Sequence, residues 1–111
     1  MSEAHTIRRG DVVMINRTRP TGNEMKKDRP QLVLSPDDLN EQGFTLILAQ
    51  LTRGSHAYPH RVPCTFDGRE NHIVLDQIKT VHFRRVRKRI GAISPKALSL
   101  SLAILREMFA E

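Results

Sequence analysis

The sequence contains a single cysteine, Cys64, among its 111 residues. One cysteine excludes a disulfide within the chain and the paired cysteines of a structural zinc site. The five histidines show no HxxH or HExxH motif, and the sequence has no P-loop, GxGxxG or GxSxG motif. We therefore expect no metal ion and no cofactor. A lone thiol also fits a reducing compartment, which favours the cytoplasm.

Long hydrophobic runs are absent as well. No stretch approaches the roughly 18 apolar residues of a membrane-spanning helix. The first residues, MSEAHTIRRGD, lack the apolar segment of a signal peptide. We expect neither secretion nor membrane insertion. Because no internal repeat or low-complexity tract occurs, we expect a single domain over residues 1–111, with the polar run 17–28 as a long loop inside it.

Acidic residues are outnumbered by basic ones. The chain has 18 Lys and Arg against 12 Asp and Glu, which gives a formal net charge of +6. This balance favours polyanionic partners, namely nucleic acid, an acidic protein or an anionic membrane surface. The densest run of charge is RRVRKR at 84–89. Two interpretations of this run stand: a solvated basic turn, or a surface that contacts phosphates.

Short apolar segments separated by turn residues predict a mainly β fold, a small curled sheet or barrel. Strands are expected over 12–16, 32–35, 44–50 and 61–66, and within the β-branched segment 72–86. A turn or single helical turn at 36–40 should end at Gly43. The Asp67-Gly68 pair is a strong turn signal between strands.

The C-terminal segment changes to a helical pattern. Ser94 is a preferred N-cap, and Pro95 suits the first helical position. Spacings of four, three and four residues place one apolar stripe on a single helix face: Leu98, Leu102, Leu105 and Phe109. We expect this helix to cover the sheet, because a membrane-binding helix would carry Lys and Arg opposite its apolar face.

Two polar residues stand at the ends of predicted strands. Pro30 fixes its own backbone and favours an extended Arg29, which holds this guanidinium at the start of a strand. Thr52 ends the third strand and leads into a loop with further polar side chains: Arg53, His56, Tyr58 and His60. Taken singly, a surface ion pair explains Arg29 and a strand-ending hydroxyl explains Thr52.

Another polar group interrupts the last β-rich segment. Asp76 and Gln77, followed by Lys79, are expected in the middle of a strand. The interior of a strand disfavours Asp unless the carboxylate is paired or hydrogen-bonded. Asp76 therefore indicates either a functional group or a structural ion pair.

The motifs occur in an order that resembles a known family. RGDVVMIN is followed by PTGNE at 20–24, KDRPQLVLSP at 27–36, LT at 51–52, YP at 58–59 and LDQIKTV at 75–81. This series is similar to the MazF/PemK family of toxin endoribonucleases from type II toxin–antitoxin systems, nearer the MazF branch. The resemblance covers the chain from about Arg9 to the C-terminal helix.

The resemblance implies a homodimeric SH3-like β-barrel with a C-terminal helix, which cuts single-stranded RNA at a short sequence without metal. It implies an acidic, MazE-like antitoxin, whose initially disordered segment lies across a basic groove. By position it implies that Arg29 and Thr52 are the catalytic pair and that Glu24 is the loop acid. The residues expected to contact RNA are Lys27, Arg53, His56, His60, Asp76, Gln77, Lys79, Arg84, Arg85 and Arg87.

The chemistry of metal-free RNA cleavage agrees with these residue types. The 2′-hydroxyl attacks the adjacent phosphate and leaves a 2′,3′-cyclic phosphate and a 5′-hydroxyl. Arg29 would stabilise the growing negative charge, and Thr52 would hold the phosphate in line. The general base stays open between three residues, Glu24, His56 and His60.

The sequence also departs from the pattern of the family. Gln50-Leu51 precedes Thr52 and Arg53 follows it, where relatives often carry proline before the threonine and a second hydroxyl after it. Val74 stands where PemK-like members have an arginine. The cleavage sequence therefore cannot be transferred from relatives.

Two alternative functions remain at this stage. A CcdB-like toxin of the same fold would poison DNA gyrase without enzymatic activity and would not need Arg29 or Thr52. A plain nucleic-acid-binding barrel would use the basic run at 84–89, and its affinity would fall steeply with salt without any strand being cut.

Overall fold

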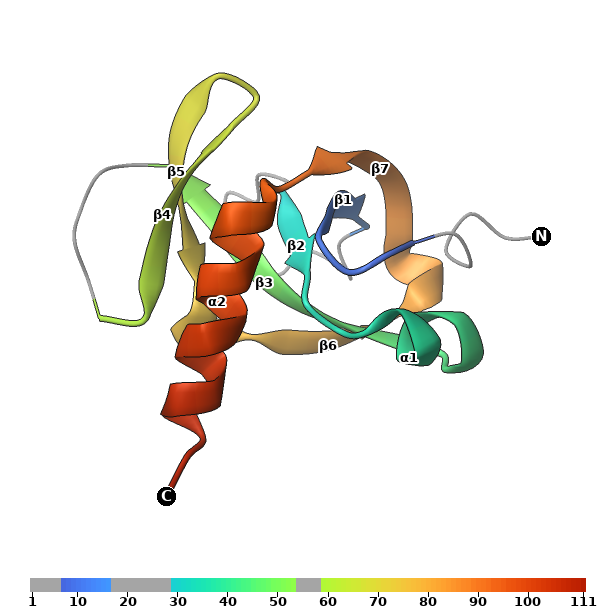
Figure 1. The fold of residues 1–111 in the computed structure, drawn as a ribbon. Helices are drawn as coiled ribbons and strands as arrows, with labels where there is room; N and C mark the ends of the chain where they lie inside the picture. The colour runs from blue at the N-terminus through green and yellow to red at the C-terminus, as the bar shows by residue number, and fades with distance from the viewer. Residues whose placement is uncertain (1–6, 17–28, 54–58) are drawn as a thin grey trace, which may run out of the picture.

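The computed structural model describes residues 7–16, 29–53 and 59–111. Within these residues it contains seven strands, two α-helices and two 3-10 helices (Figure 1). Their bounds in chain order are β1 Asp11–Ile15, β2 Gln31–Val33, α1 Asp37–Gln42, β3 Thr45–Arg53, β4 Arg61–Phe66, β5 Arg69–Val74, η2 Leu75–Gln77, β6 Lys79–His82, η3 Phe83–Arg85, β7 Val86–Ala92 and α2 Pro95–Met108.

All strand pairings are antiparallel, and β3 is the central strand. It pairs with β2 along one edge, and with β6 and then β5 along the other. The order of strands is β4-β5-β3-β2-β1-β7, with β6 beside β3. Within the described ranges the sheet is curled but open, because β4 and β7 end it without pairing to each other. The mainly β fold with a C-terminal helix is confirmed, whereas the barrel is not closed.

A side-chain contact spans the opening between the two end strands. A Cβ added at Gly91 of β7 would lie 3.0 Å from Cε1 of Phe66, the last residue of β4. A side chain at position 91 would require the Phe66 ring to move by a few tenths of an ångström. The Phe66 ring of β4 therefore lies against the backbone of β7 at Gly91.

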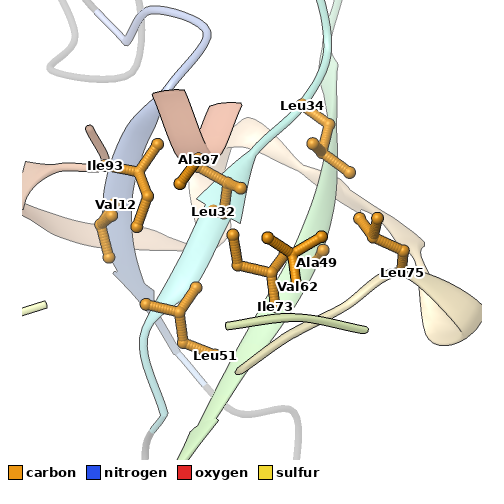
Figure 2. Packing of buried hydrophobic residues seen from close by; sticks show 10 residues of the cluster. All are labelled: Val12, Leu32, Leu34, Ala49, Leu51, Val62, Ile73, Leu75, Ile93 and Ala97. Atoms are coloured by element: carbon orange, nitrogen blue, oxygen red, sulfur yellow. The ribbon is translucent and has the colours of Figure 1, made fainter. Parts of the chain in front are cut away.

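Two hydrophobic clusters form the core, because successive side chains of each strand point to opposite faces of the sheet. The first is labelled in Figure 2: Val12, Leu32, Leu34, Ala49, Leu51, Val62, Ile73, Leu75, Ile93 and Ala97. The helix α2 covers it, packing Leu98, Leu102, Ile104, Leu105 and Met108 against these residues (Figure 1). The second cluster, on the other face, is Ile7, Val13, Ile15, Val33, Leu46, Leu48 and Val81.

The terminal helix forms as its sequence predicts. The Ser94 hydroxyl accepts a hydrogen bond from the backbone N–H of Ala97 at 3.1 Å, and Pro95 occupies the first helical position. Leu98, Leu102 and Leu105 face the core, whereas Phe109 is the C-cap and is 71% exposed. The helix therefore covers the sheet, as expected, and its apolar stripe is partly buried except for Phe109. No helix in the described part of the chain is long and apolar enough to cross a membrane.

One expectation about the segment from 72 onward, and one of the two interpretations of its basic run, are wrong. Asp76 and Gln77 do not lie in the middle of a strand, because η2 separates β5 from β6. The basic run is not a turn: Arg84 and Arg85 belong to η3, and residues 86–89 belong to β7, which pairs with β1 at one edge of the sheet. Charged side chains are a common protection of edge strands, which explains why so basic a segment forms one.

Candidate functional site

A basic hollow of about 700 Å³ opens between the end of the β4–β5 hairpin, β7 and the start of β2. Five of its lining residues are cationic and one is acidic. The lining residues are Met14, Arg29, Pro30, Leu51, Arg53, Phe66, Asp67, Arg69, Asn71, Arg87, Lys88 and Ile90. The lining combines apolar residues with an excess of cations, which is the electrostatic character of a site for a phosphate-bearing ligand.

Arg29 stands at the rim of this hollow, directly before β2. Its position is fixed by Pro30, whose carbonyl oxygen accepts a hydrogen bond from the Leu51 N–H at 2.9 Å. The pairing of β2 with β3 aligns Gln31 with Gln50, and this bond extends the same register by one residue, to Pro30 and Leu51, before β2 begins. The same alignment brings Arg29 beside Thr52, at a Cα separation of about 4.5–5.5 Å for neighbours in an antiparallel pair. The two residues of the expected catalytic pair are thus neighbours, and Arg29 is exposed.

Thr52 is half-buried, and its hydroxyl is held by its own strand. The Nε2 of Gln50 donates a hydrogen bond to Oγ1 of Thr52 at 3.1 Å. A hydroxyl has one donor and two acceptor positions, so the O–H of Thr52 remains a donor for another group. Because strand side chains alternate, Gln50 and Thr52 lie on the face opposite Leu51 and Arg53, which line the hollow.

Gln31 lies in the same region and is almost fully buried. Its Nε2 donates a long hydrogen bond, 3.4 Å, to the carbonyl oxygen of Arg29. Within the described part of the chain, its Oε1 is buried without a hydrogen-bond partner. Gln31 therefore ties the backbone of Arg29 to the sheet and leaves one acceptor beside the Gln50 position.

The DQxK segment lies at one end of the sheet, where η2 leads into β6. The Asp76 carboxylate pairs with Nε of Arg61 at 3.2 Å, and this hydrogen bond holds the pKa of Asp76 below its usual range. Gln77 is exposed in η2. Burial lowers the pKa of the Lys79 ammonium, and the nearby charge of Arg85 lowers it further. Of the two interpretations of Asp76, the ion pair is the one that the structure shows.

His60 lies at the entrance to β4, away from Thr52 in the strand pairing. Its backbone is in the left-handed region, with φ at 63°, and its carbonyl oxygen accepts from the Leu75 N–H at 3.1 Å. Its charge acts on the Asp76 carboxyl. His60 therefore belongs to the Arg61–Asp76 group rather than to the Arg29–Thr52 pair.

The basic run divides into structural and site-forming residues. Arg85 donates two hydrogen bonds to the Asn16 carbonyl oxygen, at 3.2 and 3.0 Å. Arg89 pairs with the nearly buried carboxylate of Asp11 at 3.1 Å. Arg87 and Lys88 line the hollow, and Arg84 is exposed.

Three predicted site residues lie outside the described residues: Glu24, Lys27 and His56. Conversely, sequence reasoning did not select Arg69, Asn71, His72 or Lys88. A signal for Arg69 and Asn71 was present, because the Asp67-Gly68 turn fixes the β4–β5 register. The described residues contain no group of three or more His, Cys, Asp or Glu side chains that could hold a metal ion.

Comparison with known proteins identifies relatives over most of the chain. Residues 8–109 match the family described as PemK-like, MazF-like toxin of type II toxin–antitoxin systems. The endoribonuclease toxin MazF of Escherichia coli (strain K12) is 28% identical over 92 residues, which are 82% of this chain and 83% of that protein.

Solved structures show the same fold. The MazE–MazF complex (Form-II) from Deinococcus radiodurans contains a chain with a TM-score of 0.78 at 23% identity, covering 92% of this chain and 94% of that one. An endoribonuclease in complex with its cognate antitoxin from Mycobacterial species has a TM-score of 0.71 at 18% identity, covering 96% of this chain and 93% of that one. At these identities the likeness establishes the architecture.

Proposed function

The chain belongs to the PemK-like, MazF-like toxins of type II toxin–antitoxin systems and is a MazF-like endoribonuclease toxin, and we propose that it cuts single-stranded RNA at a short sequence without a metal ion. The observation that carries this proposal is the β2–β3 alignment, which holds Arg29 beside Thr52. Arg29 also lines the basic hollow. The products would be a 2′,3′-cyclic phosphate and a 5′-hydroxyl.

The guanidinium of Arg29 is suited to the charge that develops during this reaction. As the 2′-oxygen adds to phosphorus, negative charge grows on the two non-bridging oxygens. A planar guanidinium can donate to both oxygens and keeps its charge at any working pH. The Gln31 bond to the Arg29 carbonyl oxygen and the neighbouring Leu51–Pro30 bond hold the Arg29 backbone beside Thr52, so that the guanidinium can reach this oxygen pair.

Thr52 would orient the phosphate. With one acceptor position of its hydroxyl occupied by Gln50, its O–H can donate to a phosphate oxygen. Such a bond would hold the phosphorus in line between the attacking and the leaving oxygen. Glu24 and His56 stay candidates for the general base, and Lys27 stays a candidate RNA contact; all three lie outside the described residues.

The cations of the hollow would bind the RNA backbone next to the cut, because Arg29 both lines the hollow and is aligned with Thr52. Arg53, Arg69, Arg87 and Lys88 line the hollow with Arg29. Each cation near a phosphate releases bound counterions, which favours binding at low salt. The same cations would attract an acidic MazE-like antitoxin segment, which would cover the hollow and exclude RNA. We place the active protein, a homodimer, in the cytoplasm with its RNA substrate.

The test is incubation of the purified protein with a long single-stranded RNA in excess EDTA, followed by mapping of the new ends. We expect cuts at one recurring short sequence, with cyclic phosphate and 5′-hydroxyl ends. RNA that stays intact but binds with a steep salt dependence would contradict the nuclease and support a binding barrel. Cleavage that stops in EDTA and resumes with Mg²⁺ would contradict the metal-free chemistry.

A further inference from the structure

His72 lies next to Thr52 in the sheet. The alignment of β3 with β5 pairs Thr52 with His72, and the alignment of β4 with β5 pairs His72 with Pro63. Directly opposed residues of an antiparallel pair point to the same face, with Cβ atoms about 4.5–5.5 Å apart. His72 and Thr52 are both partly exposed, so a ligand on this face can reach both.

Arg29, Thr52 and His72 therefore form one row across three neighbouring chain segments. The row follows the strand order β2, β3, β5, with Arg29 aligned just before β2. At about 4.8 Å between strands, the two ends of the row lie about 10 Å apart. A phosphate with its ribose fits between two side chains at this separation. Thr52, in the middle of the row, would contact the phosphate from the surface of the sheet.

The other described histidines do not share this position. His60 is tied to the Arg61–Asp76 group. His82 pairs with Thr45 at the opposite end of β3, stacks on Phe44 and Phe83, and accepts a hydrogen bond from the Arg84 N–H at its Nδ1. Among the histidines that the structure describes, His72 is the one aligned with Thr52.

We propose that His72 is the general base of the cleavage reaction, an inference that rests on the proposed function. A nitrogen of the neutral imidazole takes the proton of the 2′-hydroxyl while the 2′-oxygen forms its bond to phosphorus. The bond from phosphorus to the 5′-oxygen breaks, and the leaving oxygen takes a proton from water. The imidazolium then returns its proton to the solvent, so no other reactant is consumed.

The surroundings of His72 allow this exchange of a proton. On its face stand Thr52 from β3 and Pro63 from β4, with Arg61 and Thr65 diagonally placed on β4 and Glu70 two residues back on β5. Arg61 is paired with Asp76, and Glu70 is exposed. Arg29 stands beyond Thr52. Because only a neutral imidazole accepts a proton, cleavage should fall as the solution is acidified through the titration of this histidine.

The experiment measures single-turnover cleavage from pH 5 to pH 9 for the wild type, His72→Gln, Glu24→Gln and the control His82→Gln. We expect His72→Gln to lose about 100-fold or more at pH 7.5 and to lose the acid limb of the profile. His82→Gln should keep both rate and profile. If Glu24→Gln removes the acid limb and His72→Gln keeps it, the inference is overturned.

A second substrate separates a base from an acid. In RNA with a 5′-bridging sulfur at the cut, the leaving group needs no proton. The defect of His72→Gln should persist with this substrate, whereas recovery to the wild-type rate would contradict the role as base. For the wild type, the NMR titration midpoint of the His72 ring should equal the midpoint of the acid limb in the profile of cleavage rate against pH. A mismatch between the two midpoints would overturn the inference. This comparison needs no variant, so it holds even if His72→Gln fails to fold.

The two levels of failure can be told apart. If the wild type cuts RNA and His72→Gln cuts it at the same rate and with the same pH profile, only the role of His72 is refuted. A wild type that cuts no RNA removes the proposed function and the role of His72 together.

Discussion

Gln50 donates a hydrogen bond from Nε2 to Oγ1 of Thr52, 3.1 Å away and two residues further along β3. The bond fixes which lone pair of the hydroxyl is occupied and so directs its O–H toward other groups. Replacing Gln50 with Met keeps the length of the side chain but removes the donor. We expect Gln50→Met to slow cleavage about five- to tenfold, equivalent to one hydrogen bond of about 1 kcal/mol.

The matched control for Gln50 is Gln42, which is exposed at the end of α1. Gln42→Met should cleave at the wild-type rate. Equal rates for Gln50→Met and Gln42→Met in the same assay would show that the bond does not serve Thr52.

The cations of the hollow predict how RNA binding responds to salt. Arg69 and Lys88 line the hollow from β5 and β7. If each contacts one phosphate, Arg69→Ala or Lys88→Ala should reduce the slope of log affinity against log salt by about 0.7. The measurement is fluorescence anisotropy with a 2′-O-methyl RNA, which lacks the attacking hydroxyl. Arg106→Ala, on α2 and outside the hollow, should leave this slope unchanged. An equal reduction of the slope in Arg106→Ala would mean that RNA binding does not depend on the hollow.

The Arg61–Asp76 pair predicts a stability that depends on pH. Because the pKa of Asp76 is lowered in the folded protein, its charged form stabilises the fold above the ordinary Asp value of about 3.9, and this contribution is lost as the pH falls through the lowered value. Asp76→Asn should therefore unfold at a lower urea concentration than the wild type at pH 7. The difference between the two urea midpoints should become smaller toward pH 3. A difference of constant size would indicate that the charge of Asp76 does not contribute to stability.

The Ser94 hydroxyl caps α2 through the Ala97 N–H. Ser94→Ala should lower the free energy of unfolding by about 1 kcal/mol, as is typical for loss of an N-cap. Urea denaturation measures this change. Ser99→Ala, at an exposed position inside the same helix, is the control and should change stability far less. A smaller effect at Ser94 than at Ser99 would be inconsistent with the cap.

Local signals in the sequence predict much of this fold. Asp67 and Gly68 adopt positive φ values of 55° and 75°, as a two-residue hairpin turn requires. Ser94 and Pro95 begin α2 where capping preferences place its start. These features depend only on neighbouring residues, so composition and spacing are sufficient to locate them.

Features that depend on pairing between distant segments were not predicted. The 3-10 turn at Asp76 interrupts a β-branched run, because the chain passes there from β5, which pairs with the end of β3, to β6, which pairs with its beginning. The basic strand β7 forms because β1 offers it a partner. His72 becomes a candidate only when the β3–β5 register is known. Strand propensity does not fix a register between distant segments, so these features could be located only from the structure.

The role of Arg29 tests the account most directly. Single-turnover cleavage of RNA in EDTA should be compared for the wild type, Arg29→Ala and Arg106→Ala, with folding checked by circular dichroism. Because Arg29 is exposed, its loss should leave the fold intact while the rate falls about 100- to 1,000-fold, and Arg106→Ala should match the wild type. A folded Arg29→Ala that cuts within threefold of the wild-type rate would contradict the account.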